Sequence, residues 1–390
     1  MTISRRLCLL LAAFLVSPGL ANRVAAKEAH PGKYLVYVGT YTTGASKGIY
    51  AYRFDASSGQ LTPLGLAAET MNPSFVAVQP NRRFILYAVN EITNYKGQSS
   101  GALSAFAIDH QSGKLSLVNQ VPSGGADPCY VSLDKTGRYV LVANYTGGSV
   151  SVFPVRKDGG LGEASAFIQH VGSGVNTERQ EGPHAHWIEV TRDNRFAIAA
   201  DLGLDQLKIY RFNVKNGSLA PNNPEYAKVG PGAGPRHFAF HPSGRFGYVV
   251  NEMQSTIDAF SYDAANGRLR HLQTVSTLPK NYAGKNDTAE LQVHPSGKFL
   301  YASNRGQNSI AIFAIDDRSG TLKPIENVLA GGKTPRSFEI DPSGSRMFVA
   351  NQDSDNIVIF RINSQTGRLT PTGQIITVPS PVCVKFVALQ

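Results

Sequence analysis

Polar and charged side chains recur at matching points of a repeated strand–turn–strand motif in this chain. Each copy reads as an apolar strand, a turn built on Pro-x-Gly or Pro-Asn-Arg, and a second apolar strand that ends in a polar residue. In such a hairpin the start of the first strand and the end of the second meet at the end opposite the turn. The residues brought together in this way are Ser74 with Glu91, Cys129 with Tyr145, His184 with Asp201, Arg236 with Glu252, Glu290 with Arg305, and Arg336 with Gln352.

Three neighbouring copies carry complementary pairs, namely His184 with Asp201, Arg236 with Glu252, and Glu290 with Arg305. Guanidinium groups bind carboxylates, phosphates and oxyanions through paired donors, and imidazole or carboxylate groups transfer protons. A ring of such groups could bind an anionic substrate and activate water. The alternative is that each pair is an ion pair that fixes two strand ends.

The elements that must position these residues follow a seven-fold repeat. A turn that ends in glycine, with leucine close behind it, lies between two alternating segments, and glycine supplies the positive φ that a tight hairpin turn needs. Its glycines recur at intervals of about 50 residues, and they are Gly59, Gly113, Gly159, Gly217, Gly267, Gly320 and Gly367.

The second motif has six complete copies and one split copy. The split copy has its first strand at Val382–Ala388 and its second strand at Tyr34–Thr40, so strands from both ends of the chain complete one sheet. Such closure removes exposed sheet edges. The repeats predict an all-β, seven-bladed β-propeller whose last blade is closed by the N- and C-terminal strands. Two tandem β-sandwiches, the main rival, do not explain the split copy.

The first 26 residues have the order of a secretory signal peptide. Arg5 and Arg6 precede the apolar run Leu7–Val16, and small residues follow up to Ala26. We expect a signal peptide at 1–26, one propeller domain at 27–390, and export to the periplasm or outside the cell. The Ser4–Leu7 stretch also resembles a twin-arginine signal, and a buried N-terminal helix is the other alternative.

Composition narrows the function classes. Net charge falls from +10 to +7 without residues 1–26, because three arginines leave with them. The remaining basic residues are scattered, so nucleic-acid binding has little support. The run Leu7–Val16 is too short to span a bilayer, and no other apolar run is long enough. Cys129 and Cys383, the thiols left after the signal, form neither a disulfide framework nor a zinc site.

Several short motifs resemble a known family. They are Tyr37–Thr42, Asn144–Gly148, Gly182–His186, Gly234–His237, Val250–Glu252 and Ser303–Gly306. Together, over 33–389, they resemble the seven-bladed lactonase family, which includes 6-phosphogluconolactonases of the cycloisomerase type and carboxy-cis,cis-muconate cyclases. The resemblance implies lactone chemistry and a catalytic set of His184, Arg236, Glu252 and Arg305 in the channel.

We predict roles for these groups in hydrolysis of a cyclic ester. Arg236 and Arg305 would bind an anionic group and the developing oxyanion. Glu252 or His184 would be the general base, and a lowered pKa of Glu252 beside Arg236 slightly favours His184. Asp201 could set the tautomer of His184.

The remaining channel-mouth residues are predicted to bind or orient the substrate. They are Asp201, Glu290, Arg336, Glu91 and His186. Glu290 is expected to orient Arg305.

Other chemistry is less favoured. His184, His186 and Asp201 could bind a divalent ion, but such groups are usually structural, and we predict no metal and no cofactor. Cys129 reads as an inert small side chain, because its own blade offers it no histidine. His237 should point to the opposite face from Arg236 and serve packing.

Two functions outside hydrolysis stay open. One is an exported, non-enzymatic propeller that binds a protein or a surface polymer, and the other is a cycloisomerase that forms a lactone from an unsaturated diacid. The predicted partner is a small anionic or sugar lactone. Because an exported enzyme would not meet 6-phosphogluconolactone in its intracellular pathway, the resemblance supports lactone chemistry more than that substrate.

Overall fold

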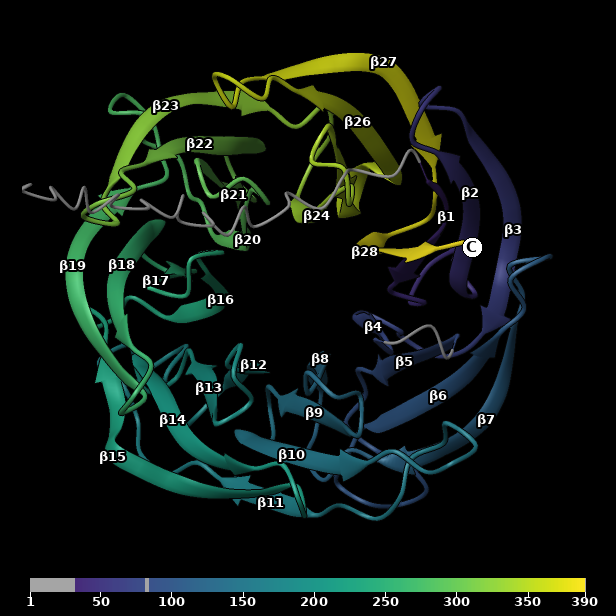
Figure 1. Ribbon diagram of the computed structural model, residues 1–390, viewed down its shortest axis with the longest axis horizontal. Helices are drawn as coiled ribbons and strands as arrows, with labels where there is room; N and C mark the ends of the chain where they lie inside the picture. Colours follow the sequence, from purple (N-terminus) through teal and green to yellow (C-terminus); the bar gives the residue numbers. More distant parts are fainter. Residues whose placement is uncertain (1–31, 81–83, 390) are drawn as a thin grey trace, which may run out of the picture. The chain divides into compact units, whose positions relative to one another are not determined.

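The computed structural model describes residues 32–80 and 84–389. Seven four-stranded antiparallel sheets stand around a central channel (Figure 1). The predicted seven-bladed propeller is therefore confirmed. The proposed signal peptide at 1–26 lies outside the described residues, and the described residues form no helix long and apolar enough to cross a bilayer.

The two inner strands of each blade carry the motif that ends at the channel mouth. The innermost strands are β28 (Pro381–Ala388), β4 (Val76–Val78), β8 (Pro128–Leu133), β12 (Ala185–Val190), β16 (Pro235–Phe240), β20 (Thr288–Val293) and β24 (Pro335–Ile340). Their neighbours are β1 (Lys33–Thr40), β5 (Ile85–Asn90), β9 (Tyr139–Asn144), β13 (Phe196–Asp201), β17 (Phe246–Asn251), β21 (Phe299–Asn304) and β25 (Arg346–Asn351).

The two outer strands of each blade are joined by the glycine turns. The third strands are β2 (Gly48–Asp55), β6 (Ala102–Ile108), β10 (Ser149–Pro154), β14 (Gln206–Asn213), β18 (Thr256–Asp263), β22 (Ser309–Ile315) and β26 (Asn356–Ile362). The outermost are β3 (Leu61–Glu69), β7 (Leu115–Pro122), β11 (Ala166–Gln169), β15 (Ser218–Lys228), β19 (Arg268–Ser276), β23 (Leu322–Leu329) and β27 (Leu369–Thr377). A short 3₁₀ turn, η1, spans Gln352–Ser354.

The ring is closed by the two ends of the chain, as the split repeat predicted. β28 pairs with β1 from Tyr34 opposite Ala388 to Thr40 opposite Pro381, and β2 and β3 complete that blade (Figure 1). The N-terminal strand is thus second in its sheet and has no free edge.

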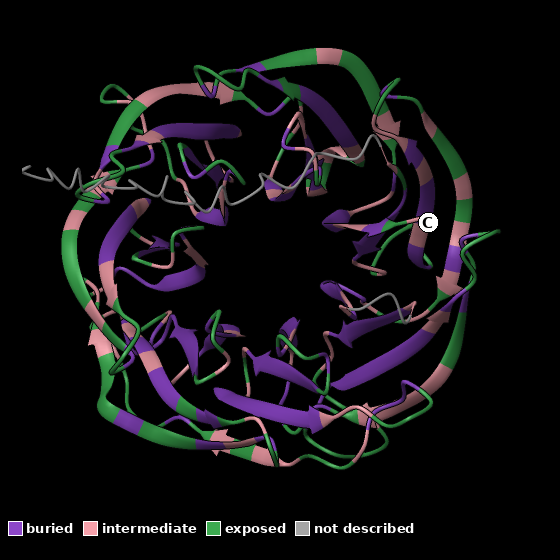
Figure 2. Cartoon of the chain, in the orientation of Figure 1, coloured by how far each residue is buried: buried purple, intermediate pink, exposed green. Residues whose placement is uncertain are grey.

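Burial falls from the inside of each blade outward (Figure 2). The strand next to the channel strand is buried along its length in most blades, as in β9 and β17, because neighbouring blades pack on both of its faces. Outer strands such as β19 alternate between exposed and half-buried residues. Strands covered on both faces read as continuous apolar runs, whereas half-exposed strands alternate.

The glycine turns also join one blade to the next. Gly320 has φ +73°, its carbonyl accepts a hydrogen bond from Tyr248 at 3.0 Å, and a Cβ there would collide with the ring of Phe246. The same tyrosine-to-glycine bond recurs from Tyr301 to Gly367 at 2.9 Å. The repeated glycine is therefore required by backbone conformation and by blade packing together.

We predict that Gly320→Ala lowers the free energy of unfolding more than Gly373→Ala does. Both glycines have positive φ, but a Cβ at Gly373 meets nothing within 4 Å. The two losses of unfolding free energy should differ by about 1–3 kcal/mol, the cost of overpacking where the Cβ meets the neighbouring blade. Urea denaturation of both variants measures it, and equal losses would contradict a packing role for Gly320.

Candidate functional site

A β-bulge at the start of the channel strands shapes the channel mouth. In β16 the register shifts between Pro235, which pairs with Asn251, and His237, which pairs with Val250. The same shift occurs in β8, β12 and β24. A bulge leaves one residue unpaired and re-aims side chains. As a result Arg236 and the adjacent His237 both line the same small cavity in the channel.

The carboxylate of Glu252 is the centre of the mouth. Its Oε2 lies 2.9 Å from Arg236 Nε and 2.8 Å from Arg305 Nη2, and its Oε1 accepts a hydrogen bond from Arg179 Nη2 at 2.6 Å. Burial alone would raise the pKa of Glu252, but Arg305 and Arg236 outweigh it and lower the pKa to about 2. The carboxylate is therefore ionised and holds three guanidinium groups.

Arg236 and Arg305 are further anchored to the backbone. Arg236 Nη1 donates to the Ala289 carbonyl at 2.7 Å, and Arg305 Nη2 donates to the Thr288 carbonyl at 2.9 Å. Burial, with Arg305 and Arg336 nearby, lowers the pKa of Arg236 to about 10. Arg236 Nε is taken up by the ion pair with Glu252, whereas the buried Nε of Arg305 has no hydrogen-bond partner among the described residues.

Arg179 is a site residue that the sequence analysis missed. It lies in the long connection between β11 and β12, outside the strand ends from which the mouth residues were predicted. Gln180 beside it is fully buried and donates to the Leu202 carbonyl at 2.7 Å and to Asp205 Oδ1 at 2.8 Å. This anchor holds the loop so that Arg179 reaches Glu252. The motif pattern contained no signal for it.

His184 lies beside this cluster, and Tyr145 connects the two. The imidazole stacks on the Tyr145 ring with centroids 4.6 Å apart, and the Tyr145 hydroxyl lies 3.4 Å from Arg179 Nη2. His184 Nδ1 lies 3.1 Å from the Tyr145 carbonyl, which can only accept, so we assign the proton to Nδ1. Its Nε2 lies 3.2 Å from the exposed carboxylate of Glu181.

The expected role of Asp201 is wrong. Its carboxylate accepts the backbone N–H of His184 at 2.9 Å and contacts His170 Nδ1 at 2.5 Å, so it does not bind the His184 ring. Asp201 occupies the place that Asn144, Asn251, Asn304 and Asn351 hold in other blades, at the end of the second strand. It is fully buried and structural.

The expected roles of Glu290 and His237 are also corrected. Glu290 does not bind Arg305; its Oε1 lies 3.1 Å from His237 Nδ1. Burial, opposed by Glu290, lowers the pKa of His237 to about 4. A neutral ring can donate from Nδ1 to Glu290 and accept at Nε2 from Arg236 Nη1, 3.3 Å away. His237 is thus a positioning residue for Arg236, because the bulge carries it into the channel instead of away from it.

Arg336 and Glu91 form a second charged group in the channel. The Arg336 guanidinium lies over the Tyr41 ring, 5.3 Å from its centroid, and the Tyr41 hydroxyl donates to Glu91 at 2.9 Å. Burial raises the pKa of Glu91, and Arg336 opposes this effect. Both residues line, with Arg236, a cavity of about 10 Å³, the room that one water molecule needs.

His186 and Cys129 pack together deeper in the channel wall. Cys129 Sγ lies 3.6 Å from His186 Nδ1, a partner from the next blade. Burial raises the pKa of Cys129 well above its usual range and lowers that of His186 far below, so both are neutral. Among residues 32–80 and 84–389, no three His, Cys, Asp or Glu side chains form a group that could hold a metal ion.

Comparisons with known proteins decide the family. The model of the family described as "Lactonase, 7-bladed beta-propeller" matches residues 35–386. The chain belongs to this family. A 6-phosphogluconolactonase of Bacillus subtilis is 39% identical over 354 residues, covering 91% of this chain and 98% of the relative. A solved periplasmic gluconolactonase of Pseudomonas aeruginosa is 37% identical with a TM-score of 0.86, covering 92% of this chain and 100% of that one.

Membership of the lactonase family confirms the resemblance drawn from the motifs, and with it the prediction of a lactone-hydrolysing enzyme. A 6-phosphogluconolactonase of Formosa agariphila is a further relative, 37% identical over 309 residues that cover 77% of this chain and 85% of the relative.

We predict that Glu252→Gln destabilises the lactonase by about 3–5 kcal/mol at pH 7, because three guanidinium groups lose their shared carboxylate. The folded pKa of Glu252, about 2, is below the usual value of 4.5, so its contribution is present above pH 4.5 and is lost as pH falls toward 2. Stability from denaturant unfolding should fall through this window in the wild type and fall less in the variant.

Glu326→Gln is the matched control. Glu326 pairs with a single exposed arginine, Arg368, and its loss should change stability by no more than about 1 kcal/mol. Equal stability of Glu252→Gln and the wild type at pH 7 would show that the arginine cluster does not depend on this carboxylate.

Proposed function

We propose that this chain hydrolyses a sugar-type lactone at the channel mouth around Glu252. The observation that carries the proposal is the set of three guanidinium groups on one buried carboxylate, beside a histidine. A purely structural ion pair needs one cation for each anion. The excess of positive charge fits a site where negative charge develops during reaction.

The arginines are proposed to bind the ester carbonyl. As water adds to that carbon, negative charge moves onto the carbonyl oxygen, and donors already in place stabilise it without reorganisation. Arg236 and Arg305 are held in place by Glu252 and by backbone carbonyls. Arg179 and Arg336 add positive charge that favours the carboxylate formed as the ring opens.

His184 is the proposed general base, and Glu252 the group that holds the arginines. A carboxylate with a pKa of about 2 is a poor proton acceptor near neutral pH. With its proton on Nδ1, His184 has its lone pair on Nε2, where the attacking water would replace the exposed Glu181 carboxylate that lies 3.2 Å away. The histidine takes a proton from water as the new C–O bond forms, then returns it to the ring oxygen as the ester bond breaks. The product is an open-chain hydroxy acid.

The substrate class comes from the relatives and from the N-terminal sequence. One relative is named a 6-phosphogluconolactonase and another a periplasmic gluconolactonase. The basic, apolar and small-residue order of residues 1–26 supports export. We therefore propose an unphosphorylated sugar δ-lactone, met outside the cytoplasm.

We expect Arg236→Lys to lower kcat/KM for D-glucono-δ-lactone by about 100-fold, since a lysine cannot reproduce the paired donors of a guanidinium. His184→Gln should lower kcat by about 10²- to 10⁴-fold through loss of proton transfer. Both predictions are tested by initial rates of acid release, followed with a pH indicator. Arg245→Lys, at an exposed arginine that pairs with Asp317, is the matched control and should stay within two-fold of the wild type. Wild-type rates in both site variants would exclude this mouth as the active site.

The proposed export of the chain can be tested separately from its activity. The full chain, expressed in a Gram-negative host, should appear in the periplasm with its N-terminus near residue 27, whereas a chain starting at Lys27 should stay in the cytoplasm. Cell fractionation and mass spectrometry of the intact protein check both. An unprocessed full chain in the cytoplasm would contradict export and would favour a phosphorylated substrate.

A further inference from the structure

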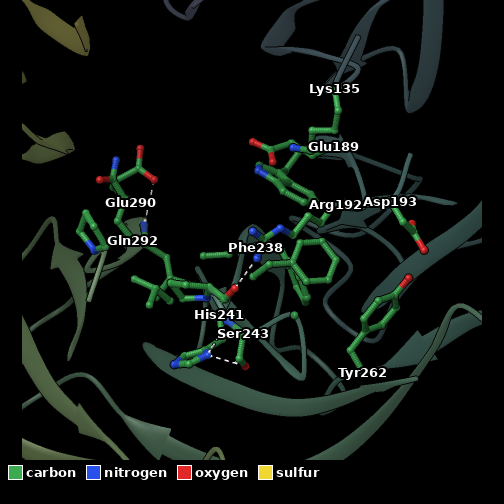
Figure 3. A pocket seen from close by; sticks show the side chains of 18 of the residues that line it. Lys135, Glu189, Arg192, Asp193, Phe238, His241, Ser243, Tyr262, Glu290 and Gln292 are labelled. Carbon is green, nitrogen blue, oxygen red and sulfur yellow. Dashed lines mark hydrogen bonds between the residues drawn. The ribbon is translucent and has the colours of Figure 1, made fainter. Parts of the chain in front are cut away.

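A second cavity lies at the end of the channel opposite Glu252. It measures about 990 Å³ and is formed by the turn ends of the inner strands, including the turns that contain Lys135, Arg192 and Ser243. These turns join the first and second strands of their blades, so they lie at the opposite strand ends from the residues that meet at the mouth. Figure 3 shows this cavity with Lys135, Glu189, Arg192 and Tyr262 around it.

Aromatic rings form one continuous wall of this cavity. The successive ring centroids are 4.2 Å apart for Phe75 and Tyr130, 5.9 Å for Tyr130 and Trp187, 5.5 Å for Trp187 and Phe238, 4.9 Å for Phe238 and Phe240, and 5.2 Å for Phe240 and Tyr262. Phe75, Tyr130, Trp187 and Phe238 are buried, so Phe240 and Tyr262, which are half-buried at the outer end of the series, offer most of the ring surface that a ligand can contact. In the three blades that follow, the positions that match Trp187 hold His237, Glu290 and Ser337. The aromatic surface is therefore confined to one sector.

Side chains of both charges border the aromatic wall. Lys135 and Arg192 are exposed, and Arg192 uses Nη1 to donate to the Pro242 carbonyl at 2.6 Å. Glu189 is half-buried and accepts a hydrogen bond from the Tyr130 hydroxyl at 2.8 Å on Oε1. The cavity thus offers both hydrogen-bond donors and a carboxylate acceptor next to apolar rings.

The two ends of the channel are separate sites for a sugar-sized molecule. The large cavity and the small one beside Arg236 share Phe75 and Glu290 as a common wall. The small cavity holds about 10 Å³, room for roughly one water molecule. Glu252 does not line either cavity, so a ligand seated in the large cavity does not contact it.

We propose that the cavity at the turn end binds a short neutral saccharide. A pyranose ring has apolar C–H faces that pack on aromatic rings, and hydroxyl groups around its edge that need both donors and acceptors. The balance of Lys135 and Arg192 against Glu189 and Asp193 disfavours a polyanion. The volume is at the upper end of the range for small-molecule pockets, which fits more than one sugar ring.

The only tryptophan in the chain is a built-in reporter of this cavity. Trp187 is 2% exposed and belongs to the aromatic wall, so ligand binding here should change its emission. The tryptophan emission of the purified protein is followed during titration with maltotriose, cellotriose and N,N′,N″-triacetylchitotriose, which are all neutral. Each titration is repeated by calorimetry to detect binding that leaves the emission unchanged. We expect saturable binding of at least one trisaccharide.

Variants at the two ends of the channel locate the binding. Arg192→Ala and Tyr262→Leu should each raise the dissociation constant for the trisaccharide at least five-fold. The rate of D-glucono-δ-lactone hydrolysis should stay within two-fold of the wild type. Arg179→Ala at the Glu252 mouth, and Arg368→Ala at an exposed arginine that lines neither cavity, should leave trisaccharide affinity unchanged. Arg192 is exposed, so its variant still tests the proposal if the tyrosine variant folds poorly.

Two results would overturn the proposal. One is the absence of saturable binding of all three trisaccharides by both methods. The other is binding that Arg192→Ala leaves unchanged and Arg179→Ala weakens, which would place the sugar at the Glu252 mouth.

Discussion

The ionised carboxylate of Glu252 is the interaction on which the channel mouth depends. Four arginines, Arg179, Arg236, Arg305 and Arg336, point positive charge into a narrow, largely buried space, and like charges in such a space repel strongly. Glu252 contacts three of them and keeps them in place, at the expense of its own basicity. The same charge arrangement that stabilises the folded mouth therefore favours His184 for proton transfer and leaves the arginines to bind the substrate.

A backbone irregularity makes this arrangement possible. In a regular strand, successive side chains alternate, so Arg236 and His237 would face opposite ways. The bulge at the start of β16 places both in the channel, where His237 connects Arg236 to Glu290. The repeat of the bulge in several blades means that the propeller supplies pairs of adjacent inward residues around the channel. The residue types at these inward positions then decide whether a blade gives the channel charged side chains or aromatic ones.

The features that repeat were predictable from the sequence, and the features that break the repeat were not. The seven glycine turns and the split copy led directly to the closed ring, because turn conformation and edge protection are local or topological requirements. The meeting of Arg236, Glu252 and Arg305 followed from hairpin geometry. Arg179 was missed because it lies in a loop held by the tertiary contacts of Gln180. His237 and Glu290 were misjudged because a one-residue bulge changes the register, which the residue pattern does not reveal. Asp201 was misjudged because it takes the strand-end place that asparagine holds in other blades.

The channel has two chemically different ends, and we assign lactone chemistry to the one that contains Glu252. A crystal structure of the protein with D-gluconate, the product of glucono-δ-lactone hydrolysis, tests this assignment most directly. We predict that the product carboxylate lies against Arg236 and Arg305, with the sugar chain beside His184. Gluconate bound only in the aromatic cavity at the opposite end would contradict it.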